Sequence, residues 1–127
     1  MAPTSVLGDP NEQTVWEARR ISLTSTASGN RLPTTRYRVT AASLYWTTGR
    51  LGTKPRSVPL WAVRDAELNQ SLAQRARRLG TITVSLQHRD YTGSPTYVLI
   101  EDVERPNEAR RLIEDAARAA RRDHDTA

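Results

Sequence analysis

Short stretches of alternating apolar and polar residues run through most of the chain before residue 101. The clearest stretch places Ile82, Val84 and Leu86 on one side and threonine, serine and glutamine on the other, which is the period of a half-buried β-strand. The same period predicts seven strands, over residues 15–23, 36–40, 43–48, 56–60, 61–68, 81–87 and 96–100. Pro59 has no N–H to donate, so the fourth strand is expected at a sheet edge.

The period changes to that of an α-helix at Pro106. Apolar residues then recur every three or four positions, and proline suits the first turn, where its missing N–H is no loss. This pattern predicts a C-terminal helix over about residues 106–121, with Leu112 and Ile113 in its apolar stripe.

A short helix or turn is expected between the fifth and sixth strands. Residues 71–79 are mostly polar, but Leu72, Ala76 and Leu79 recur at helical spacing. Gly80 follows directly and is expected to end this helix, because glycine readily adopts the left-handed conformation of a helix C-terminus.

The order of these elements defines the fold class. Strands that follow one another without intervening helices exclude a doubly wound α/β fold. The pattern predicts a mainly β protein, a seven-stranded antiparallel barrel or sandwich capped by one C-terminal helix. The expected organisation is a flexible arm over residues 1–13, one domain over 14–121 and a tail over 122–127.

Length and composition limit the number of domains and exclude several kinds of site. The chain has 127 residues, which suffices for one ordinary domain, and it contains no cysteine. Disulfides, thiolate metal sites and cysteine nucleophiles are therefore excluded. No apolar run approaches the roughly twenty residues of a membrane span, and the first residues do not resemble a secretory signal. A cytoplasmic location is expected, with attachment to the membrane periphery as an alternative.

The positive charge is concentrated in one half of the sequence. Between Trp16 and Arg64 there are nine basic residues and one acidic residue, a net charge of +8, whereas the whole chain carries +5. Such asymmetry indicates an anionic partner, although arginines that simply face solvent would give the same count.

The sequence predicts no enzyme, no metal site and no cofactor. The two histidines, His88 and His124, lie in a predicted turn and in the tail. His88 with Asp90 and a nearby serine lacks the nucleophile elbow and oxyanion loop that a hydrolase needs. The glycine-containing loops precede strands and not helices, so they do not match phosphate-binding loops.

Several turn and strand motifs resemble those of bacterial PH-like domains. They are a Tyr-Arg-Val-Thr strand at Tyr37, a Gly-Arg-Leu turn at Gly49, and the segments Val58-Pro59-Leu60, Val63-Arg64-Asp65, Gln70-Ser71-Leu72 and Leu79-Gly80-Thr81. With the helix that begins at Pro106, the resemblance covers about ninety residues. It implies a bent, seven-stranded antiparallel barrel with a C-terminal helix. The best-known members carry transmembrane helices before the domain, and this chain departs from them, because it is expected to be a soluble member without such helices.

The resemblance also implies where an anionic ligand would bind. In this architecture the loops between strands one and two and between strands three and four lie at the open end, opposite the helix. Arginine suits phosphate or carboxylate groups through its planar fork of donors. The candidates in these loops and their flanks are Arg19, Arg20, Arg31, Arg36, Arg38, Arg50, Lys54 and Arg56.

The leading functional hypothesis is a non-enzymatic binding or scaffold module that acts through protein contacts and self-association. PH-like relatives form homo-oligomers through barrel edges, and the edge at Pro59 offers such a surface. The candidate interface residues are Trp16, Val58, Leu60 and Trp61. A nucleic-acid-binding small barrel and peripheral binding to anionic lipid remain as alternatives.

Overall fold

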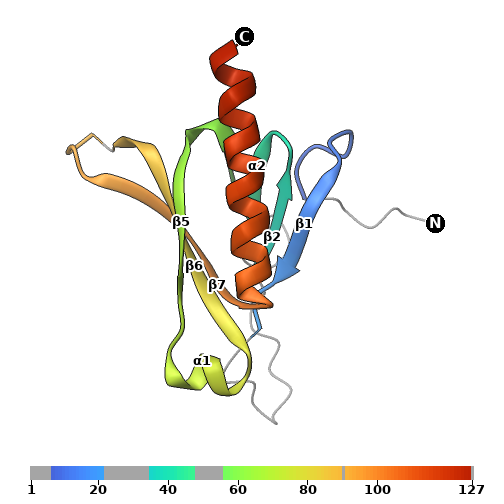
Figure 1. Cartoon of the computed structure of the whole chain (residues 1–127), viewed down its shortest axis with the longest axis vertical. Coiled ribbons are helices and arrows are strands. Elements are labelled where there is room, and N and C mark those ends of the chain that lie inside the picture. Colours follow the sequence, from blue (N-terminus) through green and yellow to red (C-terminus); the bar gives the residue numbers. More distant parts are fainter. Residues whose placement is uncertain (1–6, 22–34, 48–55, 90, 127) are drawn as a thin grey trace.

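The computed structural model describes residues 7–21, 35–47, 56–89 and 91–126, which form two antiparallel sheets and a long helix (Figure 1). The first sheet has the strand order β1 (Thr14–Arg19), β2 (Arg36–Thr40), β3 (Ser43–Thr47), β4 (Arg56–Pro59). The second has the order β5 (Val63–Asn69), β6 (Leu79–Arg89), β7 (Pro95–Glu104). The helical elements are the 3₁₀ turn η1 (Leu60–Ala62), α1 (Leu72–Ala76) and α2 (Pro106–Thr126).

The core lies between the two sheets and beneath α2. The helix contacts η1, β5, β1 and β6, so it covers residues of both sheets. Its buried face carries Ala109, Ile113 and Ala117, while Leu112 is only half-buried. The alternating residues of the strands meet this face, and Ile82, Val84 and Ile100 are fully buried there.

The strands follow the predicted order, but their closure and ends differ from the prediction. The four-stranded and three-stranded sheets are not joined into a closed barrel by hydrogen-bonded ladders among the described residues. The predicted fifth strand begins two residues late, because η1 turns the chain between the sheets. The first strand ends at Arg19 and not at 23, and β7 runs on to Glu104 and not to 100.

The short helix α1 lies within the predicted segment, but the apolar residues at helical spacing, such as Leu72, do not form its buried face. Leu72 is 84% exposed, whereas Gln74 is buried. Ser71 and Gln74 form a capping box, in which the Ser71 hydroxyl accepts from the Gln74 N–H and the Gln74 side chain accepts from the Ser71 N–H.

The sequence predicted that Gly80 ends α1, and this prediction is wrong. Gly80 lies inside β6, where an added Cβ would come within 2.7 Å of Pro106 Cβ. Its role is to let the start of α2 approach the sheet. The left-handed residue after α1 is Arg78, with φ 59°.

The segment before β1 is an ordered cover and not the flexible arm that we expected over residues 1–13. Residues 7–13 lie across the outer face of the first sheet, and residues 1–6 lie outside the described part. Arg38 of β2 is only 2% exposed, because its guanidinium donates to the carbonyls of Leu7 and Asp9, both at 2.9 Å, and to that of Glu12. Its Nε donates to Thr14 Oγ1 at 2.7 Å. One arginine thus binds three backbone carbonyl groups of this segment.

The C-terminal residues are also ordered, which corrects the predicted tail over 122–127. The helix α2 continues to Thr126. The ring of His124 stacks on Trp61 with centroids 4.0 Å apart, and Arg121 donates to the Val63 carbonyl. These contacts fix the end of the helix to η1 and β5.

The buried face of α2 gives a direct test of its role. Ile113→Ala leaves a cavity at a fully buried position, so we expect it to lower the free energy of unfolding by about 2–5 kcal/mol. Arg118→Ala, on the exposed face, should change it by no more than about 0.5 kcal/mol. Equal, small effects in urea unfolding would contradict the packing of α2 on the sheets.

Removing the guanidinium of Arg38 should release the covering segment. For Arg38→Met we expect a loss of about 2–3 kcal/mol in the free energy of unfolding, because charged hydrogen bonds to buried carbonyls disappear. Amide hydrogen exchange of residues 7–13 should become faster, while Arg56→Met, at an exposed arginine, leaves it unchanged. Unchanged exchange in the Arg38 variant would show that the segment is held by other contacts.

Candidate functional site

Those of the predicted basic residues that the structure describes do not gather into one site. Three of them, Arg31, Arg50 and Lys54, lie outside the described residues. Arg19 and Arg36 are direct neighbours across β1 and β2, and exposed Arg56 begins β4 on the other side of β3. The remaining two, Arg20 and Arg38, are engaged within the protein.

Arg38 is not available to an external anion, which corrects its prediction as a ligand residue. Arg38 alternates along β2 with Tyr37 and Val39, which are buried in the core, so its side chain lies on the outer face of the sheet. That face is covered by residues 7–13, whose carbonyls take up the guanidinium donors. No periodic pattern in residues 7–13 indicated that they would cover this face.

Arg20 takes part in a polar network that connects the two sheets. Its Nε donates to Asp102 Oδ2 at 3.1 Å, and its Nη2 lies 3.0 Å from Glu101 Oε2. The other Asp102 oxygen accepts from Gln74 Nε2 at 2.6 Å. The backbone continues the connection, because the Ile21 N–H donates to the Asp102 carbonyl at 2.8 Å. Asp102 therefore joins β1, α1 and β7.

The network shifts the pKa of two of its members. Burial alone would lower the pKa of Arg20, but the hydrogen bond to Asp102 and the charges of Glu101 and Asp102 outweigh it, so the pKa is raised. Burial raises the pKa of Tyr37, although the hydrogen bond from the Glu101 N–H to its hydroxyl, 3.0 Å long, acts in the opposite direction. Arg20 stays charged and paired, and Tyr37 stays neutral.

A groove with basic walls adjoins this network. It has a volume of about 640 Å³ and lies between α1, the end of β7 and the start of α2. Its arginines come from α1 and the residues after it and from the residue before α2: Arg75, Arg77, Arg78 and Arg105. A smaller hollow of about 320 Å³, which Arg19 lines, continues from it along β1. Of the described members of the predicted anion-binding set, only Arg19 lines either hollow.

The predicted interface residues divide into core and surface. Leu60 is fully buried in the core, which corrects its prediction as an interface residue. Trp16 and Val58 are half-buried and pack against the same core. Trp61 is 39% exposed, but one face of its ring is covered by His124.

The largest exposed apolar side chains on a strand edge lie on β7, which sequence reasoning missed. Tyr97 and Leu99 are 60% and 42% exposed and point away from the core, while Val98 and Ile100 point into it. The alternation was visible in the sequence. The signal overlooked was that both outward positions of this strand are apolar.

Neither a metal centre nor a membrane span is found in the described part of the chain. No group of three or more histidine or carboxylate side chains is arranged to hold a metal ion there. None of the helices described is both long and apolar enough to cross a bilayer.

The strand order, the long C-terminal helix and the matching sequence together decide the family. A model of the bacterial PH domain matches residues 15–117, from β1 into α2. The chain belongs to the bacterial PH domain family. PH-like domains are generally non-catalytic binding modules, so membership of the family indicates a binding or scaffold module. No curated protein and no solved structure matches the chain.

The buried hydroxyl of Tyr37 predicts a loss of stability of this bacterial PH domain in alkali. A tyrosine whose folded pKa is raised stabilises the fold below its unfolded pKa, near 10, and this contribution is lost as the pH rises through the folded pKa. In urea unfolding, the stability advantage of the wild type over Tyr37→Phe should shrink between about pH 8 and about pH 11. Tyr91→Phe, at a fully exposed ring, serves as the control and should show no such trend. A stability difference between the wild type and Tyr37→Phe that does not change with pH would contradict the burial of the Tyr37 hydroxyl.

Proposed function

We propose that this bacterial PH domain is a non-enzymatic scaffold that self-associates through the free edge of β7. The observation that carries the proposal is the exposure of Tyr97 and Leu99 on a strand that pairs only with β6 among the described residues. An edge strand offers unpaired N–H and C=O groups to another strand. Proteins normally protect such an edge with charge, proline or a cover.

Beyond Pro95, the first residue of β7, the free part of the strand lacks that protection. From Thr96 to Ile100 no residue carries a charge, and the first charged residue is Glu101. The cross-strand neighbours Thr83 and Ser85 are uncharged as well. The high β-propensity of Thr-Tyr-Val-Leu-Ile suits continued pairing. This stretch therefore favours the addition of a further strand.

A second copy of the chain fits this edge by symmetry. If two β7 strands pair antiparallel about Val98, Tyr97 of each copy lies across from Leu99 of the other on the outward face. Such an isologous contact buries both exposed side chains twice. Aromatic and aliphatic residues directly across an antiparallel ladder stabilise each other. This geometry supports a homodimer, and an extended peptide from another protein would use the same edge.

The alternatives have weaker support. A nucleic-acid interface needs basic residues interleaved with exposed aromatic rings, whereas Tyr97 lies beside uncharged residues. The edge at Pro59, which we expected to mediate assembly, is only four residues long, and its Val58 packs into the core. The β7 edge is longer and carries the apolar side chains that an interface requires.

The proposal is tested by placing a charge on the edge. Sedimentation velocity over a range of concentrations should show a dimer for the wild type. Leu99→Lys should weaken that dimer by about tenfold or more, because two-fold symmetry brings both lysines into one interface. Leu72→Lys is the matched control, since Leu72 is also exposed but lies on α1. A wild type that is monomeric throughout, or equal effects of the two substitutions, would contradict the proposal.

A further inference from the structure

The groove beside α1 combines an apolar floor with basic walls. Ile21, Leu79 and Pro106 contribute apolar surface, while Gln70 and Asn107 add polar groups. Its volume of about 640 Å³ lies within the usual range of small-molecule sites. These are the proportions of a binding site for a small polar ligand.

The charge that lines the groove is mostly positive. Four arginines and the single carboxylate of Glu104 line it, a net charge of +3. Among the residues that the structure describes, no ion pair or side-chain hydrogen bond occupies the guanidinium groups of Arg75, Arg78 or Arg105. By contrast, Arg20, Arg110 and Arg118 each have a carboxylate partner. The groove therefore contains positive charge that its own carboxylates do not neutralise.

The position of Arg105 is unfavourable for the folded chain alone. Arg105 precedes Pro106, and its carbonyl accepts the first hydrogen bond of α2, from the Ala109 N–H at 3.0 Å. That is the N-cap position, where serine, threonine, asparagine and aspartate are preferred. A cation there lies at the positive end of the helix dipole. An anion in the groove would offset this repulsion.

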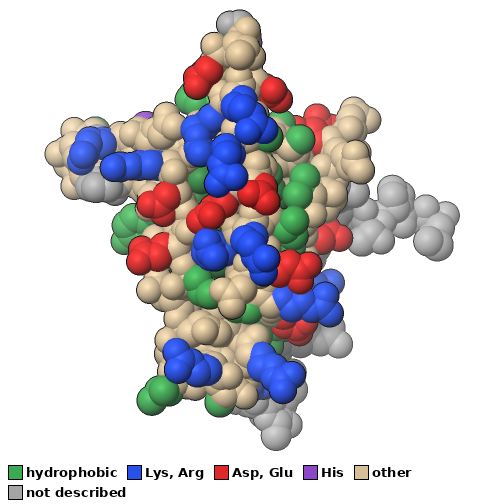
Figure 2. Space-filling view, in the orientation of Figure 1, with side chains coloured by type: hydrophobic (Ala, Val, Ile, Leu, Met, Phe, Trp, Pro, Cys, Tyr) green, Lys and Arg blue, Asp and Glu red, His purple; other side chains and the backbone are tan. Residues whose placement is uncertain are grey.

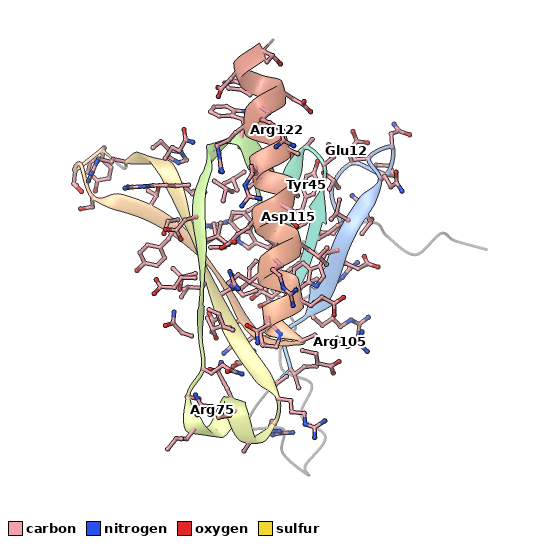
Figure 3. All side chains as sticks on the ribbon, in the orientation of Figure 1. Glu12, Tyr45, Arg75, Arg105, Asp115 and Arg122 are labelled. Carbon is pink, nitrogen blue, oxygen red and sulfur yellow. The ribbon has the colours of Figure 1, made fainter. Side chains whose placement is uncertain are left out.

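The backbone holds two of these arginines in place from opposite sides. Arg78 and Arg105 both adopt left-handed conformations, with φ of 59° and 47°, where residues other than glycine are uncommon. Arg78 lies between α1 and β6, and Arg105 joins β7 to α2, so the backbone of each is held between two regular elements. Figure 3 shows Arg75 on α1 and Arg105 at the base of α2, and in Figure 2 basic side chains lie at this end of the molecule.

We propose that this groove binds a phosphorylated ligand carrying at least two negative charges. Several guanidinium groups match the oxygens of a phosphate group, with charge-assisted and bidentate hydrogen bonds. Beyond Pro106, which has no N–H, the next N–H groups of α2 have no partner within the helix and lie at the same end. The ligand is either a soluble phosphate compound or the phosphate headgroup of a lipid. This site lies apart from the β7 edge and does not depend on self-association.

The experiment compares two matched double variants. Arg75→Gln with Arg105→Gln removes two charges from the groove, whereas Arg111→Gln with Arg122→Gln removes two exposed charges from α2. Inorganic tripolyphosphate is titrated calorimetrically into each protein. In a second arm, each protein is floated with phosphatidylcholine vesicles that contain or lack phosphatidic acid.

We expect tripolyphosphate or the phosphatidic acid vesicles to bind the wild type and the α2 variant. Binding to the groove variant should weaken by about tenfold for each guanidinium removed. Loss in the titration identifies a soluble ligand, and loss only in flotation identifies a lipid headgroup. Absence of binding in both arms, or equal weakening of the two variants, would overturn the proposal. Sedimentation of the groove variant separates this result from the β7 proposal, because its assembly should equal that of the wild type.

Discussion

The buried carboxylate of Asp102 is the interaction on which the arrangement of the two sheets depends. A bulge in β7, where Glu101 and Asp102 together face Thr81, turns Asp102 into a left-handed conformation with φ 52°. Its two oxygens then reach Arg20 beyond the end of β1 and Gln74 of α1. A buried carboxylate is tolerated only when it is paired and fully hydrogen-bonded, so these partners are required together. The same bulge directs the chain toward Pro106 and thereby sets the start of α2.

Arginine has two different roles in this protein, and the sequence does not distinguish them. Arg38 and Arg20 are internal: one binds carbonyls of the N-terminal cover and the other bridges the sheets. Arg75 and Arg105 are exposed in a groove without carboxylate partners. The net charge counted between Trp16 and Arg64 favoured Arg20 and Arg38 as ligand residues, because such a count considers only position along the chain. What decides availability is the number of acceptors around each guanidinium, which arises only from tertiary contacts.

Local periodicity was sufficient for most of the fold and insufficient for the contacts that complete it. The limits of β2 and the start of α2 agree with the sequence, because alternation and Pro106 are local signals. The prediction of which face of α1 points inward was wrong. Gln74 is buried there because it belongs to the capping box and donates to Asp102, and hydrophobic spacing reveals neither contact. Gly80 was likewise wrongly predicted to end the helix. Its real role is the close contact with Pro106, and a local pattern cannot reveal a contact between residues distant in sequence.

The bulge at Asp102 also separates the two proposed surfaces. Before it, β7 has a free edge, with Tyr97 and Leu99 facing outward. At Asp102 the edge is no longer free, because the carbonyl accepts the Ile21 N–H from the segment after β1. Beyond it, the strand ends at the groove that contains Arg105. A strand added to the edge would therefore stop before the groove, and an anion in the groove would not obstruct assembly. One irregularity in a strand thus keeps the surface proposed for assembly apart from the groove proposed for the ligand.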